Sequence, residues 1–242
     1  ITVINPHEVP YIRMTLGWLQ EQEISVTHSA EMDRFSIPPG QRYRPFEKVV
    51  PGDWSSAAFP LAAAAVTGST LSLEGLDIND TQGDMAIVDY LRRMGADIDV
   101  SGHTLTIRPG RLAGATFDLN ATPDALPAMA VVAACAEGET VLTNVAQARI
   151  KETDRIRVLA EELAKMGVSV RELPDGLCIR GGGLKGAVVD ARGDHRIVMA
   201  LAVAGLRAEG TTTILTAEAA GVTYPGFVDA MRRIGAEMDL EP

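Results

Sequence analysis

The order of hydrophobic and polar segments along this chain repeats in three similar blocks. Each block opens on an aspartate, continues through an Ala-rich apolar run to a glycine, and then enters a run of β-branched residues. The opening aspartates are Asp53, Asp124 and Asp194. They lie about 70 residues apart, a period long for a solenoid but suited to a repeated α/β subdomain. The sequence therefore predicts an internal threefold repeat.

The first block predicts the elements of one unit. A helix is expected from Asp53, its N-cap, to residue 67, with Gly68 at its end. Residues 69–73 alternate as a strand, and apolar residues at helical spacing predict a second helix over 82–94. Short strands are expected over 97–100 and 104–107. With one preceding strand, the order is βαβαββ.

The Ala-rich helices are apolar on every face, which is typical of helices buried on all sides. Three such helices predict an α/β (α+β) fold in which the units pack with pseudo-threefold symmetry around inner helices. Their N-termini would then point the same way, and free N–H groups together with positive dipole ends would form a site for anions. We expect the three units over about 46–117, 118–186 and 187–242.

The residues before the first unit resemble the second half of another unit. Residues 10–20 predict a helix, and 23–28 and 34–37 predict strands, without the aspartate-led helix that should precede them. The first residue is Ile1 rather than Met. We therefore expect residues 1–45 to be the tail of a preceding domain, and the chain to be a fragment of a longer protein.

Composition narrows the classes of function. The chain has 242 residues, 46% of them hydrophobic, and a formal net charge of −10. This acidity argues against nucleic-acid binding, but a local cluster of cations could still bind a small anion. The longest apolar run, 57–66, is too short to span a membrane, and two isolated cysteines give no zinc motif or disulfide framework. We therefore expect a cytoplasmic protein.

Two charged clusters are not required by the repeat. The first, Lys151-Glu152-Thr153-Asp154-Arg155, is expected to begin a helix that runs to residue 166. On that helix Lys151 and Arg155 would share a face. They could form a solvated, salt-bridged surface, or they could hold a phosphate or carboxylate while Glu152 moves a proton.

The second cluster, Asp194-His195-Arg196, lies at the start of an inner helix. Asp53 and Asp124 are each expected to act as helix N-caps. His195 and Arg196 need partners in addition, because an unpaired charge at a buried helix start is very costly.

Together these clusters resemble signature motifs of the EPSP synthase family, the 3-phosphoshikimate 1-carboxyvinyltransferases. The resemblance covers essentially the whole chain in order. The supporting matches are Gly52-Asp53-Trp54-Ser55-Ser56-Ala57, Pro123-Asp124, Pro10-Tyr11-Ile12 and Thr223-Tyr224-Pro225. The resemblance implies an enolpyruvyl transferase-like inside-out α/β barrel of two domains, each with three βαβαββ units. This chain would hold the C-terminal domain, 46–242, and the tail of the N-terminal one.

The resemblance also implies the reaction. Shikimate 3-phosphate and phosphoenolpyruvate would give 5-enolpyruvylshikimate 3-phosphate and phosphate, with no metal and no cofactor. The partners would be these two substrates and the missing N-terminal domain, without nucleic acid or membrane. The N-terminal substrate-binding motifs of the family are absent from this chain, which would hold about half of the site and be inactive without the rest.

Four residues match catalytic positions of the family. Asp124 would take the proton of the attacking 5-hydroxyl, and Glu152 would transfer a proton at the phosphoenolpyruvate methylene. Lys151 would assist proton transfer and contact shikimate 3-phosphate. His195 matches the histidine beside the phosphoenolpyruvate pocket.

Other residues match substrate-binding positions. Arg155 and Arg196 match the pair that grips the phosphoenolpyruvate carboxylate, with Asp194 beside them. Tyr11 matches a tyrosine near shikimate 3-phosphate, and Gln147 stands where some members have asparagine.

Two positions depart from the family pattern. Val222 stands where some members carry a lysine, and Glu8 stands where a serine often contacts the substrate phosphate. Two alternative functions remain open. One is the sister enolpyruvyl transferase that acts on UDP-N-acetylglucosamine, and the other is a non-catalytic domain that binds one anion.

Overall fold

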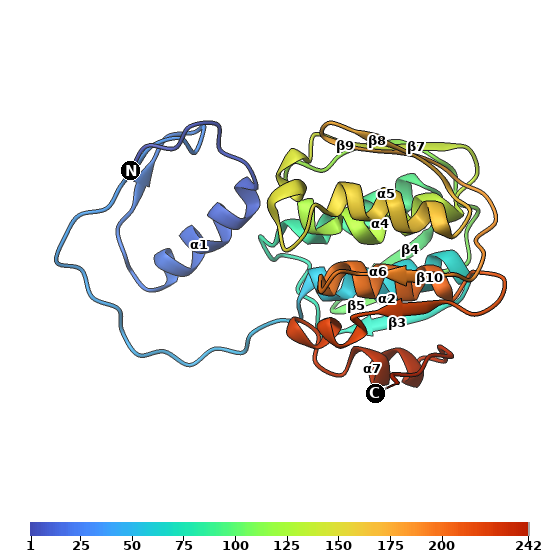
Figure 1. Cartoon of the computed structure of the whole chain (residues 1–242). Helices are drawn as coiled ribbons and strands as arrows, with labels where there is room; N and C mark the ends of the chain where they lie inside the picture. The colour runs from blue at the N-terminus through green and yellow to red at the C-terminus, as the bar shows by residue number, and fades with distance from the viewer. Residues whose placement is uncertain (242) are drawn as a thin grey trace.

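The N-terminal part of the chain stands apart from the rest. A computed structural model describes residues 1–241. Helix α1 (Val9–Glu21) and a two-stranded antiparallel pair, β1 (Thr27–His28) and β2 (Phe35–Ser36), form this part. The chain then runs as a long irregular arc to the second helix (Figure 1). The helix and both strands were predicted, but the strands are only two residues long.

The first unit has a three-stranded antiparallel sheet in the order β3-β5-β4. Its elements are α2 (Trp54–Thr67), β3 (Leu71–Glu74), the 3-10 helix η1 (Gly83–Ala86), α3 (Ile87–Arg93), β4 (Asp97–Ser101) and β5 (Thr104–Arg108). The helix predicted over 82–94 therefore begins as a 3-10 turn.

The second unit has a four-stranded sheet in the order β6-β7-β9-β8, in which only β6 and β7 are parallel. Its elements are β6 (Thr116–Asp118), η2 (Pro123–Ala125), α4 (Leu126–Cys135), β7 (Glu139–Thr143), η3 (Ala146–Ile150), α5 (Arg155–Lys165), β8 (Ser169–Leu173) and β9 (Gly176–Arg180). A Cβ at Gly176 would lie 1.9 Å from the carbonyl oxygen of Leu142 on β7, so glycine is required for this pairing.

In the part of the third unit that the structure describes, the named strands form one parallel pair. Its elements are β10 (Val188–Asp190), α6 (His195–Gly205), β11 (Thr213–Leu215), η4 (Ala217–Val222) and α7 (Phe227–Arg233). Within residues 1–241, only the second unit contains the whole βαβαββ order. The first lacks the leading strand and the third lacks the final hairpin, so the sequence pattern overstated how complete these two repeats are.

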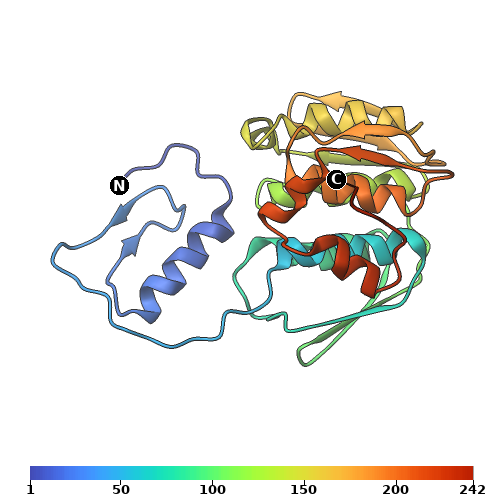
Figure 2. The same ribbon diagram turned by 60° about the horizontal axis from the view of Figure 1, so that its bottom comes forward.

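Helices α2, α4 and α6 form the core, as the all-apolar pattern predicted. They pack against one another, and they lie side by side with the sheets and outer helices around them (Figures 1 and 2). Every residue of α4 from Leu126 to Ala134 is buried. Small alanine side chains let the three helix axes approach closely. None of the helices in residues 1–241 combines the length and apolar character needed to cross a bilayer.

The aspartates at the starts of these helices differ in role. Asp53 caps α2 by accepting from the backbone N–H groups of Ser55 and Ser56, and Asp194 caps α6 in the same manner. Asp124 lies within η2, and α4 has no side-chain cap. The prediction that Asp124 is an N-cap is therefore wrong. Because a 3-10 turn precedes α4, the Asp124 carboxylate accepts no N–H group of that helix, and it contacts cationic side chains instead.

The helix after the first charged cluster also begins later than predicted. Asp154 is the N-cap of α5 and accepts from the backbone N–H of Arg157, so the first helical residue is Arg155. Lys151 has an extended backbone and lies outside the helix. The prediction that Lys151 and Arg155 share a helix face is therefore wrong, because only Arg155 belongs to the helix.

The cap of α2 yields a testable prediction. Asp53→Ala should lower the free energy of unfolding by about 1–2 kcal/mol, because two backbone N–H groups lose their acceptor. Asp53→Asn should cost less, but not nothing. Each carboxylate oxygen accepts one of the two N–H groups, at 3.0 Å, and the amide keeps one acceptor only. Thermal melting of both variants measures this, with the exposed Asp89→Asn on α3 as control. An unchanged melting temperature for Asp53→Ala would contradict the cap role.

Candidate active site

Arg155 is the centre of a buried ion-pair network. Its side chain has no solvent exposure. Its Nε donates to Asp194 at 2.8 Å, Nη1 donates to Asp124 at 2.8 Å, and Nη2 donates to Glu152 at 2.5 Å. Burial opposes the charge, but these carboxylates outweigh it and raise the pKa of Arg155. Three carboxylates from three segments therefore hold one guanidinium.

Asp194 both caps α6 and binds Arg155. It is fully buried and also accepts from the hydroxyl of Thr153. Burial alone would raise the pKa of Asp194, but the hydrogen bond and charge of Arg155 outweigh burial and lower it. This carboxylate therefore stays ionised and ties the second unit to the third.

Asp124 is in contact with three cations. Its Oδ1 lies 2.8 Å from Arg155 and 3.8 Å from Nζ of Lys151, and its Oδ2 lies 3.2 Å from Arg196. Its side chain keeps 16% exposure. A reactant could therefore reach the carboxylate of Asp124, but not the fully buried carboxylate of Asp194.

Arg196 links the starts of the three inner helices. It contacts Asp124 before α4, and its Nη2 donates to the hydroxyl of Ser55 in α2 at 3.2 Å. Its own position is in the first turn of α6. The Nε of Arg196 is buried and has no partner among the described residues.

His195 is held neutral. Nη1 of Arg196 lies 2.6 Å from Nε2 of His195, and an arginine can only donate, so Nε2 accepts and carries no proton. Burial and the positive charge of Arg196 lower the pKa of His195. Nδ1 faces Glu152 at 3.8 Å. Glu152 is the most exposed carboxylate of the network, at 45%.

The N-terminal part of the chain contacts the network through the first turn of α1. Glu8 precedes this helix in the left-handed region, with φ 54°, and its Oε1 lies 3.3 Å from Nζ of Lys151. The Tyr11 hydroxyl donates to Asp84 of η1, which is buried. Gln147 of η3 donates to the backbone carbonyl of Asn120 at 3.0 Å.

The structure thus brings together most of the residues that sequence patterns singled out. Lys151, Arg155, Asp194 and their neighbours form one connected network, whereas Gln147 is not bonded into it. Sequence reasoning missed Asp84 and Ser55, and it treated Glu8 only as a departure. The one available signal for Asp84 was a carboxylate inside a predicted apolar helix stripe, which needs a partner if the helix is buried.

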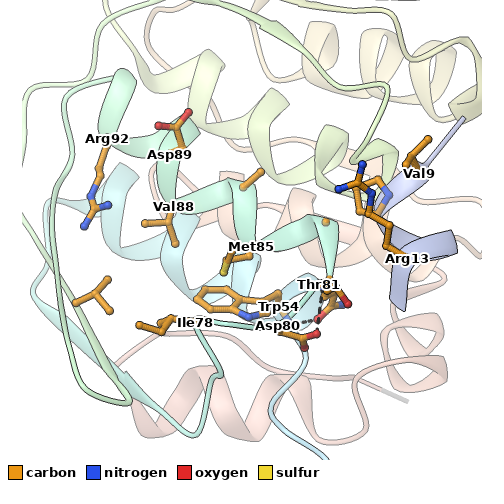
Figure 3. A pocket seen from close by; sticks show the side chains of 15 residues that line it. Val9, Arg13, Trp54, Ile78, Asp80, Thr81, Met85, Val88, Asp89 and Arg92 are labelled. Carbon is orange, nitrogen blue, oxygen red and sulfur yellow. Dashed lines mark hydrogen bonds between the residues drawn. The ribbon is translucent and has the colours of Figure 1, made fainter. Parts of the chain in front are cut away.

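A separate cavity of about 780 Å³ lies between α1 and the first unit. Trp54, Ile78, Met85 and Val88 line it, with Arg13 on one side (Figure 3). None of the residues of the ion-pair network lines it. In residues 1–241, no cluster of three His, Cys, Asp or Glu side chains is arranged to hold a metal ion.

Known proteins match this chain along nearly its whole length. The sequence model of EPSP synthase, described as 3-phosphoshikimate 1-carboxyvinyltransferase, matches residues 1–231. A 3-phosphoshikimate 1-carboxyvinyltransferase of Ruminiclostridium cellulolyticum is 50% identical over 240 residues, which are 99% of this chain and 57% of the relative. One of Methanocella arvoryzae is 48% identical over 233 residues, 96% of this chain and 54% of the relative.

The fold comparison agrees. A solved structure of EPSP synthase from Acinetobacter baumannii superposes with a TM-score of 0.75 at 32% identity, covering 92% of this chain and 53% of that one. A second structure of an EPSP synthase from the same organism gives 0.77 at 29% identity, covering 96% and 55%. The chain spans about half the length of the curated relatives it matches. From its motifs, its inner-helix fold and these matches, the chain belongs to the EPSP synthase family.

Proposed function

We propose that this chain forms the C-terminal half of a 3-phosphoshikimate 1-carboxyvinyltransferase. The enzyme would transfer the enolpyruvyl group of phosphoenolpyruvate to the 5-hydroxyl of shikimate 3-phosphate and release phosphate. The observation that carries the proposal is the network in which Asp124, Lys151, Glu152, Arg155 and Arg196 meet at the N-termini of the inner helices. The names of the relatives supply the substrates.

In this proposal Asp124 is the general base. It lies within reach of Lys151 and Arg196, which hold its carboxylate in position, and it keeps 16% exposure. The hydroxyl proton passes to Asp124 while the oxygen bonds to C2 of phosphoenolpyruvate, and C3 takes a proton from Glu152 in its acid form. Glu152 then takes a proton back from C3, the C2–C3 double bond re-forms, and the C2–O bond to phosphate breaks.

Glu152 and His195 are the proposed groups at C3. Glu152 is the most exposed carboxylate of the network, and His195 is neutral, so neither adds a positive charge beside the reacting carbon. Arg196 is the proposed partner of the substrate carboxylate. Arg155 has no exposed edge, so it could bind the substrate only if Asp124 or Glu152 released one of the N–H groups of the guanidinium.

Charge supports the need for a second half. Three cations of the network, Lys151, Arg155 and Arg196, face four carboxylates, Glu8, Asp124, Glu152 and Asp194. Two anionic substrates could not bind there without further cations.

We therefore propose that residues 1–45 end an N-terminal domain whose remainder supplies those cations, and that 46–242 form the C-terminal domain. We also propose a cytoplasmic location, which the two unpaired cysteines, Cys135 and Cys178, support.

The first prediction from the proposed function concerns the N-terminal part of the enzyme that this chain does not hold. The purified chain should release no phosphate from the two substrates. Co-expression with the part of the Ruminiclostridium cellulolyticum relative that this chain does not cover should restore turnover. A coupled phosphate assay measures both, and the N-terminal part alone is the control. Robust turnover by the 242-residue chain alone would contradict the proposal.

The second prediction separates chemistry from structure at Asp124. In the reconstituted enzyme, Asp124→Asn should lower kcat on the order of 10²–10⁴-fold, because an amide cannot take the hydroxyl proton. The fold should survive, since Asp124 caps no helix, is partly exposed, and leaves Arg155 paired with Asp194 and Glu152. Asp89→Asn, an exposed carboxylate, is the matched control. A near-normal kcat would move the base elsewhere, with Glu152 the next candidate.

The third prediction concerns Asp194. Asp194→Asn should destabilise the chain by about 3–5 kcal/mol, because Arg155 stays buried without its one fully buried carboxylate, which accepts from both Nε and Nη2. The lowered pKa of Asp194 means that its stabilisation is complete above the ordinary aspartate pKa, and is lost as pH falls through the lowered value. Melting temperatures measured downward from pH 7 should therefore fall less steeply for the variant. Equal melting of variant and wild type at pH 7 would contradict the role of Asp194.

A further inference from the structure

Asp84 is a buried carboxylate that the proposed mechanism does not use. It lies in η1 with 1% exposure, and its Oδ2 accepts the hydrogen bond from Tyr11. Its Oδ1 is buried and has no hydrogen-bond partner among the described residues. Burial raises the pKa of Asp84 to about 6. Such a group is costly to bury, and among residues 1–241 Tyr11 is the one side chain that is hydrogen-bonded to it.

Charged groups from three other segments also face this pair. The negative charge of Asp124 raises the pKa of both Asp84 and Tyr11, and the positive charge of Arg196 lowers both. Asp53, before α2, also raises the pKa of Asp84. The pair therefore borders the ion-pair network. It also joins two segments far apart in sequence, because Tyr11 is on α1.

The contact fixes α1 at its first turn. Pro10 packs against Gly83, where an added Cβ would lie 3.0 Å from the proline Cβ and 2.9 Å from the carbonyl oxygen of Ala121. No side chain larger than hydrogen fits there without a shift. The cavity of Figure 3 adjoins the same turn, with Val9, Pro10 and Gly83 in its wall. Tyr11 therefore has little freedom to move without breaking its bond to Asp84.

Hydrogen-bond chemistry then sets what Tyr11 can bind. A phenol carries one hydrogen and accepting lone pairs. Tyr11 gives its hydrogen to Asp84, so its oxygen presents only lone pairs to a ligand. Lone pairs bind a hydroxyl or an ammonium group, and they repel a phosphate or carboxylate oxygen.

We propose that Asp84 is a positioning residue that holds Tyr11 as a hydrogen-bond acceptor for a hydroxyl group of the substrate. The proposal rests on the proposed function. Shikimate 3-phosphate has ring hydroxyls, whereas phosphoenolpyruvate has only anionic groups and a methylene. Asp84 should therefore affect recognition of the first substrate and not of the second.

Kinetics of the reconstituted enzyme test this. Asp84→Ala should raise the KM for shikimate 3-phosphate about 10-fold, on the scale of one hydrogen bond, and leave the KM for phosphoenolpyruvate within about twofold. Asp84→Asn keeps an acceptor for Tyr11 and should restore most of the loss. Tyr11→Phe should match Asp84→Ala, and the double variant should be no worse than either single one. Asp89→Asn is the control carboxylate.

A second measurement does not depend on turnover. The chain has four tyrosines, and ring-labelled NMR can follow each phenol with pH. Burial and Asp84 raise the pKa of Tyr11. Asp84→Asn should therefore bring the titration of the resonance that is lost in Tyr11→Phe to lower pH.

The outcomes are distinct. Equal rises in both KM values, a change in kcat alone, or additive effects in the double variant would overturn the positioning role. An unchanged Tyr11 titration in Asp84→Asn would do the same. If the wild-type reconstituted enzyme releases no phosphate, the proposed function fails, and the substrate role of Tyr11 fails with it.

Discussion

The structure depends on neutralising one guanidinium that is out of water. Arg155 begins α5 and has no exposed edge, so its charge must be matched inside the protein. Asp124, Glu152 and Asp194 do this from three places in the chain. Their bonds fix the start of α5 against the starts of α4 and α6. The geometry of the whole site follows from this single constraint, because every other charged residue there contacts one of these carboxylates or its neighbour.

The same constraint bears on how the network could bind an anion. Within the described residues its cations are already paired with its own carboxylates, and Glu8 pairs with Lys151 where the first turn of α1 meets the network. Helix N-termini add only partial charges. An anionic substrate must therefore displace these internal partners or bring in cations from another part of the protein. The balance between internal and substrate carboxylates would set how tightly ligands bind.

Much of the fold could be predicted from the sequence, because the apolar pattern of α2, α4 and α6 leaves few other arrangements. The sequence also indicated that the charged clusters at 151–155 and 194–196 belong to a binding or catalytic site. What failed was local: a 3-10 turn before α4 frees Asp124 from capping, and the cap at Asp154 delays α5 past Lys151. Asp84 was missed because a period of apolar residues does not reveal which polar side chain is enclosed. Those outcomes depend on tertiary contacts rather than on spacing.

The completeness of the second unit has a consequence for local unfolding. Strand β9 lies between β7 and β8 and is buried over four of its five residues, whereas α1 has no buried residue at all. Opening of β9 exposes most of a sheet, but α1 can fray at little cost. Backbone amides of β7 and β9 should therefore exchange with solvent deuterium only through global unfolding. The first turn of α1 is the exception, because the bond from Tyr11 to Asp84 holds it, so the rest of this helix should exchange first.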